Sequence, residues 1–166
     1  MKPAERSGAR LAVVQALYEM EISGKGVIDA LAEFEAFWIG QVIDEVEHPP
    51  AETAFFRDLL RGVVEEQRAI DQRLDAALAA GWPLRRLEAV VRAILRAGAY
   101  EVMFRRDVPV KVAISEYVDV AHSFYEGEEP GLVNAVLDKV GRAVRPDDFT
   151  KGSAPKGATT KGSRAG

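Results

Sequence analysis

Two helix-like hydrophobic patterns, joined by a short basic turn, fill the stretch from residue 84 to residue 124. In each pattern the apolar side chains recur at steps of three and four residues, the spacing of one face of a helix. The first contains Leu87, Val91, Ile94, Gly98 and Val102, and the second contains Val110, Ala113, Tyr117, Val120 and Phe124. Pro109 suits the first turn of the second helix, where a missing N–H has no cost. The stretch predicts a helical hairpin with arginines on its outer face, namely Arg85, Arg92 and Arg96.

The same spacing recurs on both sides of the hairpin and predicts further helices. We expect a first helix that starts near Pro3, a second over residues 27–42, a third from about Ala51, and a last helix that ends at Arg145-Pro146. A pattern over residues 70–78 either continues the third helix or breaks from it near Glu66. No segment alternates convincingly at period two, so the prediction is an all-α fold of about seven helices without a sheet.

Gly81-Trp82-Pro83 is the clearest internal break, because glycine and proline interrupt helices. It divides the predicted helical domain, residues 1–146, into two small packed bundles at about 1–80 and 84–146. The following residues, 147–166, have no apolar periodicity and are rich in glycine, serine and lysine. We expect them to form a disordered basic tail.

Composition limits the chemistry that this chain can perform. It has 166 residues and no cysteine, which excludes disulfides and thiol catalysis. The two histidines, His48 and His122, have no partners at metal-ligand spacing, and no phosphate-binding glycine loop or nucleophile elbow is present. No apolar run reaches the length of a membrane span. We therefore expect a cytoplasmic binding protein without catalytic residues, metal or cofactor.

Charge is distributed unevenly along the chain. The net charge is −4, but residues 151–166 contain four basic residues and no acid, so residues 1–150 carry 18 basic and 26 acidic residues, or −8. An acidic body repels nucleic acid unless its basic residues cluster on one surface. One cluster, Lys2, Arg6 and Arg10, surrounds the start of the first helix, where the helix dipole disfavours cations unless an anion binds. Two interpretations stay open: a phosphate-binding end and a solvated terminus.

Tyrosines near arginines are a second feature expected of an RNA site, because aromatic rings stack on unpaired bases. Tyr18, Tyr100 and Tyr125 are the candidates. The first two lie inside apolar helix patterns, which favours a packing role for them.

Several ordered motifs resemble the NusB family of bacterial transcription antitermination factors. They are MKPAERSGARLAVVQALYEME at residues 1–21, FFRDLLRGV at 55–63, RAILRAGAYE at 92–101, DVPVKVAISEYVDVAHSF at 107–124 and LVNAVLDKVGRAVRP at 132–146. The resemblance implies two small helical bundles and a role in transcription of ribosomal RNA operons. It implies binding, together with the ribosomal protein NusE, to the single-stranded boxA element of the nascent transcript. It further implies assembly with RNA polymerase and other Nus factors, and no catalysis.

The resemblance also implies which residues form the site. The expected RNA-binding residues are Lys2, Arg6, Arg10, Arg96, Lys111, Phe124 and Glu128, and the expected partner-binding residue is Tyr18. Four positions depart from residues that are common in the family: Ser7 and Gly8 stand in place of arginine, Val91 in place of an acid, and Leu132 in place of phenylalanine.

These departures and the acidic body keep other interpretations open. The main alternative is a helical protein-interaction adaptor that has no RNA binding of its own. The RNA-recognition module of an RNA methyltransferase is disfavoured, because no glycine-rich cofactor domain follows Pro146. Without the resemblance, Lys111 would be interpreted as a solvated residue in the first turn of a helix. Asn134, in the last family-like motif, would be interpreted as a residue that caps or hydrogen-bonds a neighbouring turn. The free protein is either a monomer or a homodimer formed through the RNA surface.

Arg6 and Arg10 are four residues apart and are therefore expected on one exposed face of the first helix. Replacing both by alanine should weaken RNA binding with little change in stability, because exposed substitutions usually stay within about 0.5 kcal/mol.

Overall fold

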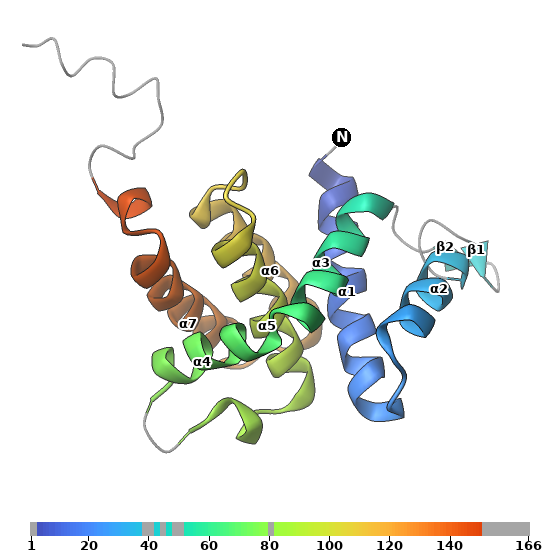
Figure 1. Cartoon of the computed structure of the whole chain (residues 1–166), viewed down its shortest axis with the longest axis horizontal. Helices are drawn as coiled ribbons and strands as arrows, with labels where there is room; N and C mark the ends of the chain where they lie inside the picture. Colours follow the sequence, from blue (N-terminus) through green and yellow to red (C-terminus); the bar gives the residue numbers. More distant parts are fainter. Residues whose placement is uncertain (1–2, 38–41, 44–45, 48–51, 80–81, 151–166) are drawn as a thin grey trace, which may run out of the picture.

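The protein is described by a computed structural model that covers residues 3–37, 42–43, 46–47, 52–79 and 82–150. Figure 1 shows a bundle of helices in which α5 occupies the middle. The described part contains seven α-helices, which confirms the all-α prediction. They are α1 (Pro3–Ser23), α2 (Val27–Phe37), α3 (Thr53–Glu65), α4 (Gln67–Ala77), α5 (Ala89–Phe104), α6 (Val110–Phe124) and α7 (Glu129–Val144).

A short β-ladder corrects the expectation that the chain has no sheet. β1 (Val42–Ile43) pairs antiparallel with β2 (Val46–Glu47). Two residues per strand are too few to produce a visible period-two pattern, which is why the sequence did not indicate them. Val42 was also expected to end the second helix, but α2 is described only to Phe37.

The predicted hairpin of α5 and α6 is present and forms the centre of the core. α5 packs against α1, α3, α4, α6 and α7, and most of its residues are buried. Gly98 lies where α7 approaches closely: an added Cβ would lie 2.6 Å from the Leu137 side chain. A short 3-10 turn, η1 (Leu84–Arg86), precedes α5, so the helix itself begins later than the apolar pattern.

The third helical pattern ends at Glu66, which resolves the alternative that the sequence left open. Glu66 has φ −103° and ψ 16°, outside helical geometry, and α4 starts at the next residue. α4 then packs against α5 and α7, while one continuous cluster of buried side chains includes residues from both halves of the chain. The division into subdomains at Gly81-Trp82-Pro83 stays a prediction.

The C-terminal boundary of the fold lies later than predicted. α7 ends at Val144, with Arg145 as its C-cap, close to the expected end at Arg145-Pro146, but a 3-10 turn, η2 (Pro146–Phe149), follows and packs back on α7. The guanidinium of Arg142 lies 4.4 Å from the centre of the Phe149 ring, and Arg145 donates to the Val108 carbonyl at 2.9 Å. Phe149 therefore belongs to the fold, while the rest of the predicted tail, residues 151–166, lies outside the described residues.

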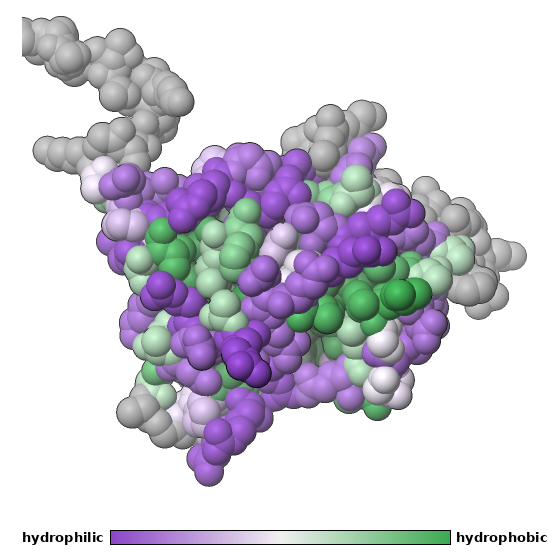
Figure 2. All heavy atoms as spheres, viewed as in Figure 1, coloured by the Kyte–Doolittle hydropathy of each residue, from purple (hydrophilic) through white to green (hydrophobic). Residues whose placement is uncertain are grey.

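One face of the molecule mixes charge with exposed apolar side chains. Figure 2 shows a band of hydrophobic residues where α3 borders α1 and α2, surrounded by hydrophilic residues.

Among the described residues, none of the helices combines the length and the apolarity that crossing a membrane requires.

Candidate nucleic-acid interface

α1 and α6 lie side by side and run in the same direction. Ser7, near the start of α1, donates a hydrogen bond from its hydroxyl to the carboxylate of Glu116, in the middle of α6, at 2.6 Å. Near their ends, Tyr18 and Phe124 line one hollow of about 400 Å³. A face defined by these two helices, here called the α1–α6 face, therefore contains several of the residues that the sequence analysis selected.

Arg10 is buried, which corrects the expectation that it is an exposed cation beside Arg6. Its side chain is 4% exposed, and its Nε and Nη2 donate to the Glu101 carboxylate at 2.9 Å and 2.6 Å. The Tyr117 hydroxyl donates to the same carboxylate at 2.8 Å, and Glu116 lies 3.1 Å from Arg10 Nη1. Burial lowers the pKa of Arg10, but the hydrogen bond and charge of Glu101 outweigh it, so the net shift is upward.

This buried network explains why a double alanine substitution at Arg6 and Arg10 cannot leave stability unchanged. Removing Arg10 would strand the Glu101 carboxylate in the core, where an unpaired charge is strongly unfavourable. Glu101 and Tyr117 were not selected from the sequence. The one sequence feature that could have indicated them is that a carboxylate and a phenol hydroxyl occur within otherwise apolar helix faces.

Arg6 remains partly exposed at the start of α1, so it meets the expectation for a surface cation better than Arg10 does. Its guanidinium lies 4.3 Å from the centre of the buried Phe55 ring, and its Nη1 lies 3.9 Å from Asp107. Arg105 approaches the same ring and pairs with Asp107 at 3.1 Å, which lowers the pKa of that carboxyl. The basic turn after α5 is therefore joined to the start of α1. Lys2 lies outside the described residues.

The remaining selected residues of the α1–α6 face are exposed. Lys111 stands in the first turn of α6, where the positive end of the helix dipole favours a bound anion. At the other end, Tyr18 and Phe124 are 39% and 40% exposed beside Val90. Glu128, also exposed, is the residue before α7 begins. The face thus has Arg6 at its start and two exposed aromatic rings at its end.

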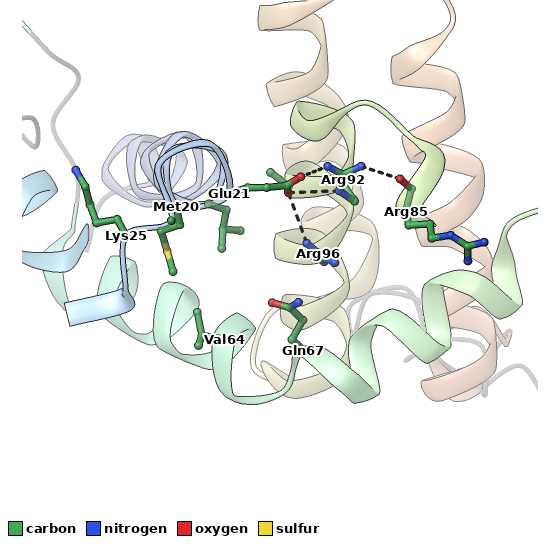
Figure 3. A pocket seen from close by; sticks show the side chains of 11 residues that line it. Met20, Glu21, Lys25, Val64, Gln67, Arg85, Arg92 and Arg96 are labelled. Carbon is green, nitrogen blue, oxygen red and sulfur yellow. Dashed lines mark hydrogen bonds and ion pairs between the residues drawn. The ribbon is translucent and has the colours of Figure 1, made fainter. Parts of the chain in front are cut away.

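Arg96 is not brought together with these residues, although the sequence analysis placed it in the same site. It forms a two-pronged pair with Asp71 at 2.9 Å and faces a separate pocket beside Arg92 and Glu21 (Figure 3). The two arginine side chains are only 19% and 12% exposed. Of the three arginines expected on the outside of the hairpin, Arg92 and Arg96 are therefore paired with neighbouring acids, while Arg85 is exposed.

The other tyrosines are engaged in packing and hydrogen bonds. Tyr100 is buried, and its hydroxyl donates to Asp58 at 3.2 Å; burial and then the charge of that carboxylate raise the pKa of Tyr100 to about 12. Tyr125 donates to Glu88, and burial raises its pKa as well. The packing interpretation of Tyr100 is confirmed. Val91, one of the positions at which the sequence departs from the family resemblance, is buried in the core.

No group of three or more His, Asp or Glu side chains in the described part of the chain is placed to hold a metal ion. His122 is exposed on α6, and His48 lies outside the described residues.

Comparisons with known proteins agree with this architecture. The NusB family model matches residues 7–142. The chain is 54% identical over 151 residues to the transcription antitermination protein NusB of Rhodopseudomonas palustris strain TIE-1, covering 91% of this chain and 87% of that protein. It is also 54% identical over 151 residues to the protein of the same name from Bradyrhizobium diazoefficiens, covering 91% of this chain and 92% of that protein.

Solved structures share the fold. NusB of T. maritima matches with a TM-score of 0.72 at 27% identity, covering 90% of this chain and 99% of that chain. A chain in the crystal structure of antitermination factors NusB and NusE in complex with dsRNA matches with a TM-score of 0.70 at 22% identity, covering 86% and 99%. The model match and the sequence identities show that the chain belongs to the NusB family of transcription antitermination proteins.

Proposed function

We propose that the protein binds boxA RNA of nascent ribosomal RNA transcripts together with NusE and thereby promotes processive transcription. The observation that carries the proposal is the α1–α6 face, which has Arg6 at its start and the exposed rings of Tyr18 and Phe124 at its end. Lys111 adds an exposed cation in the first turn of α6. Cations hold phosphates and exposed rings stack on unpaired bases, so the two ends suit two parts of a single-stranded RNA. Residues 111–124 of α6 span about 20 Å, enough for several nucleotides.

The complex in which a family member was solved with NusE supports the same assignment of partners. We place Tyr18 at the junction of RNA and NusE, because it borders the aromatic end of the face. Glu128, exposed at the residue before α7, is assigned to the RNA side. The assembly then joins RNA polymerase and other Nus factors in the cytoplasm. In the absence of RNA, the same face forms a homodimer, and light scattering with and without boxA RNA measures that association.

An equilibrium titration tests the RNA proposal. Fluorescence anisotropy would measure binding of labelled boxA RNA and of a scrambled sequence to the protein with NusE, at several salt concentrations. The boxA sequence should bind more tightly, and its binding constant should fall steeply with salt, because phosphate contacts release counterions. Equal binding of both sequences would refute the proposal.

A matched pair of arginine variants identifies the face. Arg6 and Arg142 each lie on an aromatic ring, Phe55 and Phe149, at 4.3 Å and 4.4 Å. Arg6→Ala should weaken RNA binding and reduce the salt slope by about one unit, whereas Arg142→Ala should change neither. An equal loss in both variants would remove Arg6 from the site.

The alternative function is a protein-interaction adaptor that binds NusE but not RNA. Asp107 and Glu116 favour it, because they lie within 4 Å of Arg6 and Arg10 and reduce the positive potential at the start of the face. Retention of the protein on immobilised NusE, combined with no crosslink to boxA RNA, would establish this function instead.

A further inference from the structure

A second pocket, of about 480 Å³, lies away from the α1–α6 face. Figure 3 shows it between the end of α1, the junction of α3 and α4, and the first half of α5. The RNA proposal makes no use of it.

The lining is basic, in contrast to the acidic body of the protein. Arg85, Arg92, Arg96 and Lys25 border the pocket, and Glu21 is the one acid that lines it among the described residues. Lys25 also pairs with Glu33 and Arg96 with Asp71, both outside the lining. The Glu21 carboxylate pairs with Arg92 and lies 3.9 Å from Arg96 (Figure 3). The chain therefore already places one carboxylate between two guanidinium groups at this position.

The guanidinium of Arg92 is held in place independently of Glu21. Its Nη1 donates to the backbone carbonyl of Leu87, and Arg96 keeps its two-pronged pair with Asp71. An incoming carboxylate would thus meet two oriented cations, and a preorganised site loses less entropy on binding. Glu21 is 39% exposed, so its replacement by another carboxylate does not require the core to open.

The rest of the lining includes apolar side chains. Leu17 and Met20 of α1, Val64 of α3 and Ala93 of α5 contribute to it. Among the described residues that line the pocket there is no aromatic ring, so they offer no platform on which a nucleotide base would stack. Arginines next to apolar side chains best recognise a ligand that has a carboxylate beside an aliphatic side chain.

We propose that this pocket binds an acidic segment of a protein partner, in which Asp or Glu stands next to an aliphatic residue, and that Glu21 occupies the pocket until the segment displaces it. The partner's carboxylate pairs with Arg92 and Arg96, and its aliphatic side chain packs on Leu17 and Val64. This site is independent of the RNA function proposed above.

The test uses the full chain and a blocked tetrapeptide, Leu-Glu-Glu-Leu, with Leu-Gln-Gln-Leu as the uncharged control. NMR would follow the side-chain Nε–Hε signals of Arg92 and Arg96 and the methyl signals of Leu17 and Val64. The acidic peptide should shift these signals in a saturable way, and the control peptide should not. Glu21→Gln should tighten binding about tenfold by removing the internal competitor, equivalent to about 1.4 kcal/mol.

Two further variants and one further ligand complete the experiment. Glu126→Gln, which removes an exposed acid elsewhere, should leave peptide binding unchanged, and Arg92→Gln should weaken it about tenfold. The proposal is overturned if neither the original protein nor Glu21→Gln shows saturable shifts, or if the control peptide binds equally well. It is also overturned if single-stranded RNA shifts the arginine signals and the acidic peptide does not, because the pocket would then belong to the RNA path.

Discussion

Two arginine–carboxylate connections join α1 to α5, one near each end of α1, and they differ in almost every physical respect. Near the start, α1 supplies Arg10 and α5 supplies Glu101, and both side chains are buried at 4% and 0% exposure. Near the end the roles are exchanged: α1 supplies Glu21 and α5 supplies Arg92, at 39% and 12% exposure. The same pairing chemistry thus occurs in a dry environment and a wet one.

The difference in burial gives the two connections different roles. Arg10 and Glu101 have lost their water and have Tyr117 of α6 as a third partner, so the pair fixes α1, α5 and α6 relative to one another. That arrangement positions the two helices of the α1–α6 face. The pair of Glu21 and Arg92 remains in contact with solvent, so either side chain can exchange its partner at small cost.

Breaking the buried connection should have the largest effect. Glu101→Gln keeps the size of the side chain but removes the buried countercharge of Arg10 and leaves only Glu116, a partly exposed carboxylate 3.1 Å from Nη1. We therefore expect a loss of about 3 kcal/mol in the free energy of unfolding. Urea denaturation measures it. Arg10→Met combined with Glu101→Leu should recover much of this loss, since an apolar pair of similar volume needs no countercharge. If Glu101→Gln were as stable as the original protein, the pair of Arg10 and Glu101 would not be the structural connection that we infer.

The third partner of the buried pair should matter less. Tyr117→Phe removes the hydrogen bond to Glu101 and should cost about 1–3 kcal/mol at neutral pH. Burial, and then the charge of Glu101, raises the pKa of Tyr117 well above its usual value. The folded state therefore holds this proton more tightly than the unfolded state, so the contribution to stability is complete below about pH 10 and is lost as pH rises further.

Urea denaturation at pH 8 and pH 11 checks the pH dependence. The original protein should lose stability between the two values, and Tyr117→Phe should lose less. A residual decline is expected because the pKa of Tyr100 is also raised, to about 12. An identical decline in both proteins would show that Tyr117 ionises as freely in the folded state as in the unfolded one.

The contrast between the two connections also marks the limit of what the sequence predicts. Apolar spacing is a local property, so it predicted the helices, their core faces and the hairpin of α5 and α6. Arg6 and Arg10 lie four residues apart on α1, so the apolar spacing does not distinguish them. Arg6 is nevertheless half-buried, and Arg10 is fully buried. Their difference depends on Glu101, which lies 91 positions from Arg10 in the chain and is brought near only by the tertiary fold.

Other differences have the same origin. Phe149 in the η2 turn packs against Arg142 on the surface of α7. An apolar periodicity in the sequence does not indicate a contact of this kind. Arg96 matched a family motif, but its neighbours Asp71 and Glu21 come from distant segments and direct it to another pocket. Family motifs therefore identify the fold and the general role, while the partner of each charged side chain requires coordinates.

Breaking the exposed connection should have a small effect on stability. Glu21→Gln should change the free energy of unfolding by less than about 1 kcal/mol, because exposed ion pairs gain little over their hydrated components. Raising the salt concentration to 1 M should remove even that difference, since salt screens exposed charges. Measured beside Glu101→Gln, this variant sharpens the comparison; a loss as large as that of Glu101→Gln would mean that the wet connection is also structural.

The smallest effect on stability, but a measurable effect on function, is expected at Lys111. This exposed residue in the first turn of α6 has no ion pair among the described residues within 4.0 Å, so Lys111→Gln should leave stability within about 0.5 kcal/mol. If Lys111 contacts an RNA phosphate, the variant should lower the slope of log binding constant against log salt by about one unit. Lys139→Gln on α7, equally exposed, is the control and should leave the slope intact. Equal slopes for both variants and the original protein would place the RNA path away from the start of α6, and the cationic end of the α1–α6 face would then rest on Arg6 alone.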